Sequence, residues 1–118
     1  MSLHLVGASG HAKVILDIAE QLGVEVIGLY DKDTSITNLK KYTVKAEDNI
    51  SESDDLIISI GDNYLRKAVS KKFCKNNYSL LVHPKVVISS HSQLDKGTVV
   101  MAGAVINGDT KIGAHCII

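Results

Sequence analysis

The last third of the chain carries its clearest hydrophobic pattern, a branched aliphatic residue at every sixth position. The unbroken ladder consists of Val82, Ile88, Leu94, Val100, Ile106, Ile112 and Ile118. A spacing of six matches neither the 3.6-residue period of a helix nor the two-residue alternation of a strand. It is typical of a parallel β-solenoid, in which each hexad forms one short side of a coil and the aliphatic residue points inward. The unbroken register disfavours the alternative, an antiparallel meander of short strands.

The positions between these aliphatic residues suit the corners of a coil. Glycine recurs in this stretch, with Asn and Asp nearby, and these residues favour tight turns. Four residues after each aliphatic position comes a small or slender side chain: Val86, Ser92, Thr98, Ala104, Thr110 and Cys116.

The part of the chain that precedes the ladder alternates between strand-like and helix-like patterns. Leu3–Val6 is a short apolar run that ends at a glycine-rich loop, Gly7–His11. Apolar residues then recur at helical spacing over Ala12–Leu22, and Gly23 is a natural helix stop. Val24–Tyr30 predicts a second strand, so this stretch is a β-α-β unit of a parallel sheet.

The remainder of this part predicts a compact α/β domain with about four parallel strands. Thr34–Ser53 is weakly patterned. The elements expected after the β-α-β unit are a short strand at Lys41–Val44, a loop or brief helix at Ile50–Asp55, a buried strand at Leu56–Ile60, a helix from about Asn63 to Asn76, and a last strand at Ser79–Val82.

Composition narrows the possible functions. Thirteen basic residues balance thirteen acidic ones, and there is one Phe and no Trp. A nucleic-acid surface is not expected, because it needs a basic stripe or stacking platforms. Cys74 and Cys116 lack metal-ligand spacing, so no metal site is expected. No signal peptide and no apolar run of membrane-spanning length is seen, which favours a cytoplasmic protein without membrane insertion.

The glycine-rich loop is the first candidate binding site. At the junction of a parallel strand and a helix, free N–H groups and the helix dipole favour an anion such as phosphate. Gly7 permits a tight turn and Gly10 allows close approach of a ligand. Asp31 ends the second strand, where an acidic residue often binds a ribose hydroxyl. The dinucleotide fingerprint has a third glycine that is missing here, so a purely structural turn is an open alternative.

A second loop follows the buried strand, and the histidines are further candidates. Gly61-Asp62-Asn63 and Arg66 can face the same crevice, because carboxyl ends of parallel strands share one edge. Arg66 is either a phosphate ligand or an exposed helix residue. His11, in the first turn of a helix, is expected to be neutral and either to act as a base or to cap the helix. The remaining histidines in or beside the coil are expected at turns or on the surface: His83, His91 and His115.

Together these motifs carry a family resemblance that covers the whole chain. The loop Gly7-Ala-Ser-Gly-His-Ala-Lys13, the segment Tyr30–Asp33, the segment Ser59–Asn63 with Arg66, and the hexads occur in this order. The combination resembles bacterial sugar acetyltransferases of the sialic acid O-acetyltransferase type, which include enzymes that N-acetylate nucleotide-linked amino sugars. The resemblance implies a Rossmann-like domain over residues 1–81 that binds a nucleotide-diphosphate sugar. It implies that 82–118 begin a left-handed parallel β-helix, with about two three-sided coils.

The resemblance also implies acetyl-CoA as co-substrate, surface glycan synthesis and a homotrimer with active sites between subunits. The substrate-binding residues that it implies are Gly7, Ser9, Gly10, His11, Asp31, Lys32, Gly61, Asp62, Asn63 and Arg66. In the family a His, usually followed closely by an acidic residue, deprotonates the accepting amine or hydroxyl. That His is expected beyond Ile118, and so is the acetyl-CoA site. The chain is therefore expected to bind a nucleotide sugar without transferring acetyl, and to hold no cofactor itself.

Two other functions stay open at this stage. One is a non-catalytic module that senses or sequesters a nucleotide sugar. The other is a fragment of an NAD-linked oxidoreductase, which Asp31 favours and which the missing third glycine and the hexads disfavour.

Overall fold

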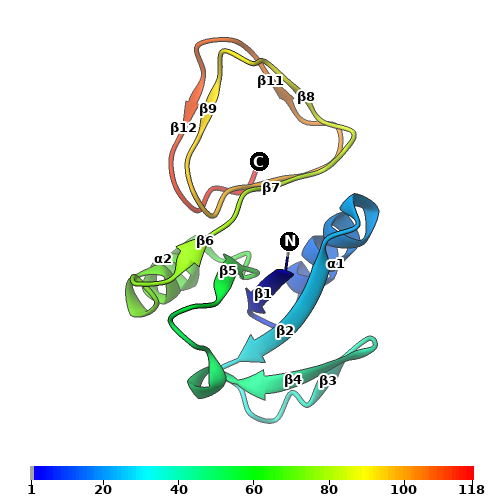
Figure 1. Ribbon diagram of the computed structural model, residues 1–118, viewed down its shortest axis with the longest axis vertical. Coiled ribbons are helices and arrows are strands. Elements are labelled where there is room, and N and C mark those ends of the chain that lie inside the picture. The colour runs from blue at the N-terminus through cyan, green and yellow to red at the C-terminus, as the bar shows by residue number, and fades with distance from the viewer. Residues whose placement is uncertain (1) are drawn as a thin grey trace.

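The computed structural model describes residues 2–118, which form a six-stranded sheet with its helices and a coil of short strands (Figure 1). In chain order the elements are β1 (Ser2–Val6), α1 (Gly10–Leu22), β2 (Glu25–Asp31), β3 (Asn38–Leu39), β4 (Tyr42–Ala46), the 3-10 turn η1 (Glu47–Asn49), β5 (Asp55–Ile58), α2 (Asn63–Lys72), β6 (Asn77–Tyr78), β7 (Leu81–Val82), β8 (Val87–Ile88), β9 (Gln93–Leu94), β10 (Val99–Val100), β11 (Val105–Ile106) and β12 (Lys111–Ile112).

The sheet has the order β3-β4-β2-β1-β5-β6, and every neighbouring pair except β3–β4 is parallel. The sheet is therefore wider than the four strands expected from sequence, and its first strand is antiparallel. Because β2 lies on one side of β1 and β5 on the other, the chain reverses its direction of travel across the sheet between β1 and β5. A crevice at the carboxyl ends is the usual consequence of such a reversal.

Helix α1 confirms its sequence pattern. Ala12, Ile15, Ile18 and Ala19 are buried, and Gly23 ends the helix at φ 70°. Helix α2, expected to reach about Asn76, ends at Lys72 instead. The reason lies in tertiary hydrogen bonds, because the Asn76 side chain donates to the carbonyls of Ser51 and Asp54 at 2.8 and 3.0 Å.

The prediction that Ser79–Val82 forms the last strand of the sheet is wrong. The sheet ends with β6, in which Tyr78 pairs with Leu56. Leu81 and Val82 instead pair with Val99 and Val100 in the coil. The local pattern could not separate the two, because both partners lie far away in sequence.

The chain from Leu81 onward winds into a three-sided coil, which Figure 1 shows end-on as a triangle. Each of its first three strands pairs in parallel with the third strand after it: β7 with β10, β8 with β11, and β9 with β12. Val100 and Ile106 point inward and are 0% and 5% exposed, as the sixfold ladder predicts. Ile88 and Ile118 belong to the same ladder but are 40% and 39% exposed, so the ladder does not bury all of its members.

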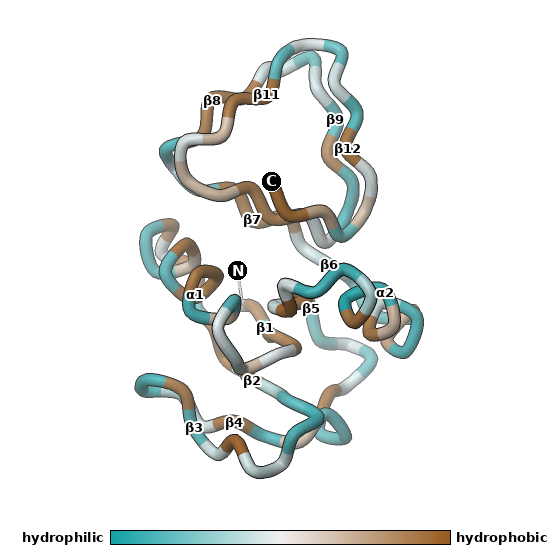
Figure 2. Tube along the Cα trace, turned by 180° about the vertical axis from the view of Figure 1, so that it is seen from behind, coloured by the Kyte–Doolittle hydropathy of each residue, from teal (hydrophilic) through white to brown (hydrophobic). Residues whose placement is uncertain are grey.

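One side of the coil shares its core with the sheet. Leu81 and Val99 are 0% and 1% exposed and belong to the same apolar cluster as Leu3 of β1 and Ile15 of α1. Figure 2 shows this as hydrophobic colouring along β7, on the side that faces α1 and β1. The sheet and the coil are therefore joined by a shared apolar core, with no separate linker between them.

Gly28 in β2 makes room for a buried polar contact on the other face of the sheet. His4 Nδ1 lies 3.0 Å from the Tyr30 hydroxyl, and His4 Nε2 lies 3.3 Å from an Asp54 oxygen. A Cβ at Gly28 would collide with the rings of both His4 and Tyr30. Glycine is required at this position because there is no room for a side chain, and not because of the backbone φ angle.

Gly28→Ala is therefore expected to lower the free energy of unfolding by roughly 1–3 kcal/mol, as overpacking a tight core does. Urea denaturation followed by far-UV circular dichroism measures the change. Gly113→Ala is the matched control, because a Cβ there meets nothing within 4 Å. Equal stability of the two variants would contradict the collision.

Candidate functional site

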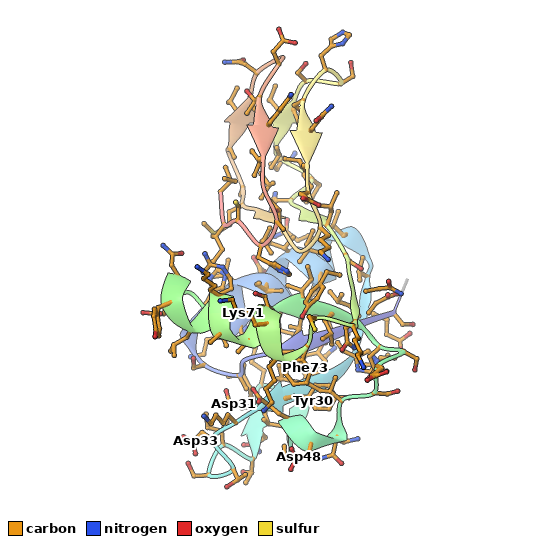
Figure 3. The ribbon with its side chains drawn as sticks, turned by 90° about the vertical axis from the view of Figure 1, so that its left-hand side faces the viewer. Tyr30, Asp31, Asp33, Asp48, Lys71 and Phe73 are labelled. Carbon is orange, nitrogen blue, oxygen red and sulfur yellow. The ribbon has the colours of Figure 1, made fainter. Side chains whose placement is uncertain are left out.

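A hollow of about 330 Å³ opens at the carboxyl ends of the central strands, and we call it the sheet-edge pocket. In Figure 3 the end of β2 at Asp31 lies between α2 and the η1 turn that carries Asp48. The lining residues come from the loops after β1, β2, β4 and β5 and from α2: Gly7, Ser9, Asp31, Lys32, Glu47, Ile60, Leu65, Ala68, Val69 and Lys72. Four of the ten residues expected from sequence are among them.

The loop Gly7–His11 turns the end of β1 into α1. Gly7 has φ 116° and its N–H donates to the Tyr30 carbonyl at 2.7 Å. Ser9 is the N-cap residue of α1, but its hydroxyl makes no capping bond. Within residues 2–118, no carbonyl accepts from the N–H groups of Gly10 and His11. These N–H groups and the positive end of the helix dipole suit an anion.

Asp31 shapes the loop that faces this anion site. Its two carboxylate oxygens accept from the N–H groups of Ala8 and Asp33, both at 2.8 Å. Asp31 thus ties the loop after β1 to the loop after β2. Each oxygen keeps a free lone pair for a ligand hydroxyl. Lys32 is exposed beside it on the pocket rim.

Helix α2 presents its apolar side to the pocket instead of to the core. Leu65 is 54% exposed, and Ala68 and Val69 line the hollow with it. Arg66 is the one buried residue of this helix. An apolar wall opposite polar strand ends is a common design for binding small ligands.

Glu47 and Lys72 close one end of the pocket with an ion pair. Lys72 Nζ lies 2.7 Å from Glu47 Oε1, and Glu47 is only 8% exposed. Neither residue was expected from sequence, because the segment around Glu47 is weakly patterned. The available signal was its place directly after a strand of the sheet, β4.

Arg66 does not reach the sheet-edge pocket. Its Nε donates to the His115 carbonyl at 2.8 Å, and Nη1 donates to the carbonyls of Ile60 and Gly61, both at 3.1 Å. Nη2 donates to the Asn63 side-chain oxygen. Arg66 is 8% exposed, so the structure places it as a buried link between α2, the loop after β5 and the coil.

The rest of the second loop also serves this link. Asp62 is the N-cap of α2 and accepts from the Leu65 N–H at 2.8 Å. Asn63 and Arg66 border a separate hollow of about 280 Å³ next to the coil. The structure therefore divides the ten expected residues. Gly7, Ser9, Asp31 and Lys32 line the sheet-edge pocket, Gly10 and His11 lie at the start of α1, and the four residues of the second loop lie apart.

Two histidines flank Arg66. His11 packs beside Gly61, and burial and the Arg66 charge lower its pKa. His115 has φ 58° and packs edge-on against Tyr78 at 4.5 Å. Burial, Lys96 and Arg66 lower the pKa of His115, and Asp95 opposes them. His11 Nε2 and His115 Nδ1 have no hydrogen-bond partner in the described residues.

The other histidines do not line the sheet-edge pocket. His4 pairs with Asp54, but its second nitrogen is occupied by Tyr30. His91 is exposed, as expected. His83, expected at a turn or on the surface, begins a turn, since its carbonyl accepts from the Val86 N–H at 3.2 Å, but it is buried at 7% exposure and its Nδ1 accepts from the Lys85 N–H at 2.9 Å. Within residues 2–118, no cluster of side chains could hold a metal ion, and no helix could cross a membrane.

A family model matches more than half of the chain. Residues 2–73 match the PglD N-terminal domain family. UDP-N-acetylbacillosamine N-acetyltransferase of Bacillus subtilis (strain 168) is 32% identical over 108 residues, which cover 83% of this chain and 50% of that protein.

Solved structures resemble the whole chain. A variant of perosamine N-acetyltransferase from Caulobacter crescentus, in complex with CoA and GDP-perosamine, superimposes with a TM-score of 0.86 at 29% identity. It is matched over 100% of this chain and 60% of its own length. The acetyltransferase domain of PglB from Neisseria gonorrhoeae FA1090 shares the fold, with a TM-score of 0.86 at 24% identity over 99% of this chain and 61% of that one. The chain thus spans half to about 60% of the length of these proteins.

The buried link predicts the effect of replacing Arg66. Arg66→Met leaves the carbonyls of Ile60, Gly61 and His115 without their donor, and roughly 3 kcal/mol of unfolding free energy should be lost. Affinity for a ligand of the sheet-edge pocket should change little, since Arg66 lies outside the pocket. Urea denaturation and titration calorimetry measure the two effects, with the exposed Lys67→Met as control. A large loss of affinity in a variant of normal stability would instead make Arg66 a ligand-binding residue.

The lowered pKa of His115 predicts a pH dependence of stability. The unfolded imidazole, with a pKa of about 6.5, binds a proton before the folded one does. The contribution of neutral His115 to the free energy of unfolding is therefore complete above about pH 6.5 and is lost as the pH falls toward the folded pKa. His115→Asn, which tolerates the positive φ, should flatten the decline of unfolding free energy between pH 7.5 and 5.5. His91→Asn is the exposed control, and an unchanged slope in His115→Asn would refute the assignment.

Proposed function

The chain belongs to the PglD N-terminal domain family, and on that premise we propose that it is the substrate-binding part of an acetyl-CoA-dependent acetyltransferase. The acceptor is the amino group of a nucleotide-linked sugar. The single observation that carries this is the sheet-edge pocket, which brings Ser9, the N-cap residue of α1, together with the acidic strand end at Asp31. Named relatives at 32% and 29% identity are N-acetyltransferases of nucleotide-linked or related amino sugars.

The proposed roles follow the pocket. The N–H groups of Gly10 and His11 bind the diphosphate, with the free Ser9 hydroxyl as a further donor. Lys32 adds a positive charge at the rim, and Asp31 accepts from the ribose. The apolar side of α2 covers the nucleoside. Gly61, Asp62, Asn63 and Arg66 support the pocket from behind instead of touching the ligand.

Residues 1–81 form the Rossmann-like domain in this proposal, and 82–118 begin a left-handed parallel β-helix. The parallel pairing of each strand with the third strand after it supports the second assignment. Val87 and Val105 stack on the outer surface of one side and are 67% and 64% exposed. Such a paired apolar surface suits the homotrimer expected from sequence. The cytoplasmic location stays a prediction.

The base that deprotonates the acceptor amine is not among residues 2–118 in this proposal. His11 and His115 have no carboxylate bonded to the ring, so nothing holds the proton that either would take up. The lowered pKa of both rings favours the neutral form. Acetyl-CoA serves as the co-substrate in this proposal, which the CoA bound to the named relative supports.

Titration calorimetry with UDP- and GDP-linked amino sugars tests the proposal. The chain should bind one of them, and Gly10→Ala should weaken binding roughly tenfold, or about 1.4 kcal/mol, because its methyl group enters the diphosphate site. A Cβ at Gly10 meets no protein atom within 4 Å, so thermal stability should not change. Gly113→Ala, equally open but in the coil, is the control.

Thiol release from acetyl-CoA in the presence of these acceptors should stay at the background rate. Turnover by this chain would place a base among the described residues. A failure of every nucleotide sugar to bind would sink the proposal as a whole.

A further inference from the structure

The pocket has a direction that follows the order of the strands. The anion site lies after β1, the acidic Asp31 ends the neighbouring β2, and Glu47 follows β4, the next strand outward. A nucleoside diphosphate whose phosphate lies at α1 and whose ribose lies at Asp31 therefore extends its base toward Glu47. This direction rests on the proposed function.

The Glu47–Lys72 pair presents a defined hydrogen-bonding edge at that end. The Lys72 ammonium has three donor positions and uses one of them on Glu47 Oε1. Within residues 2–118, Lys72 is the only hydrogen-bond donor to the Glu47 carboxylate. Both residues line the pocket, and we take the pair as one donor, the Lys72 ammonium, followed by two acceptors, the Glu47 carboxylate oxygens.

Burial of Glu47 makes its half of this edge selective, whereas the Lys72 side chain is 53% exposed. Glu47 is 8% exposed, so water competes weakly for its carboxylate. The apolar side chains of Leu65 and Val69 form the wall beside it and suit the flat face of a base. A base that leaves the carboxylate facing another acceptor is disfavoured, because like charges and lone pairs repel in a partly dry site.

Only guanine among the common bases complements this order. Its O6, N1–H and N2–H₂ present one acceptor and then two donors. Uracil presents acceptor, donor and acceptor, so its second carbonyl would face the carboxylate. Cytosine and adenine place a ring nitrogen lone pair where the carboxylate needs a donor. The carboxylate can also accept two parallel N–H bonds from guanine, the stronger arrangement.

We propose that the Glu47–Lys72 pair reads the nucleobase and selects a guanosine diphosphate sugar. Lys72 donates to O6, and Glu47 accepts from N1–H and N2–H. The pair lies outside the loops that hold the phosphate and ribose, so it sets the choice of base and not the binding of the diphosphate.

Calorimetry with GDP, UDP, ADP and CDP tests this on the whole chain. GDP should bind roughly tenfold more tightly than each of the others. In Glu47→Gln the amide oxygen still accepts from Lys72, and the amide nitrogen becomes a donor. The edge then reads donor, acceptor and donor, which complements uracil. The variant should bind GDP about tenfold more weakly and prefer UDP.

Glu52→Gln is the matched control, because Glu52 belongs to the same segment but is 76% exposed, and it should leave the preference unchanged. If Glu47→Gln does not fold, Lys72→Met takes its place, with Lys71→Met as its control. Only Lys72→Met should weaken the binding of GDP. Tighter binding of UDP than of GDP by the natural chain overturns the inference while leaving the proposed function intact. Equal weakening of all four nucleotides in Glu47→Gln does the same. Binding of none of the four overturns the proposed function as well.

Discussion

A buried guanidinium governs how the two parts of this protein fit together. The positive charge of Arg66 lies where water hardly reaches, so each of its N–H groups must find an acceptor. Backbone carbonyls of Ile60 and Gly61 in the loop after β5 and of His115 in the coil accept from the guanidinium, and the Asn63 side-chain oxygen accepts from the remaining nitrogen. The orientation of the coil against the sheet is therefore set by a planar group with fixed bonding directions as well as by apolar burial.

This arrangement separates support from recognition. Loops after β1, β2 and β4 present polar groups to the sheet-edge pocket, whereas the loop after β5 lines it only with Ile60 and uses its polar groups on Arg66 and on the start of α2. The apolar side chains of α2 are thereby left free of core packing, and Leu65 remains more than half exposed on the pocket wall. A helix that is held by one buried arginine can offer its hydrophobic side to a ligand.

Local sequence patterns predicted the elements whose formation depends on residues close together in the chain. The period of six foretold the coil, and the strand–glycine–helix pattern foretold β1, α1 and β2. The role of Arg66 could not be foretold, because its acceptors include a carbonyl 49 residues away. Glu47 was missed because its segment is weakly patterned and because its partner Lys72 lies 25 residues further on. The division of Ser79–Val82 between sheet and coil likewise depends on distant partners.

The stacking of each coil strand on the third strand after it has an evolutionary meaning. Gly97 lies directly under His115, and a side chain there would strike the imidazole, so a residue in one layer limits what the next layer can carry. Losing one residue at a corner would shift the register of the sixfold repeat, so that every later aliphatic residue would leave the interior. Such a coil changes length most readily by gaining or losing whole layers, while single insertions survive only as loops that bulge from a corner.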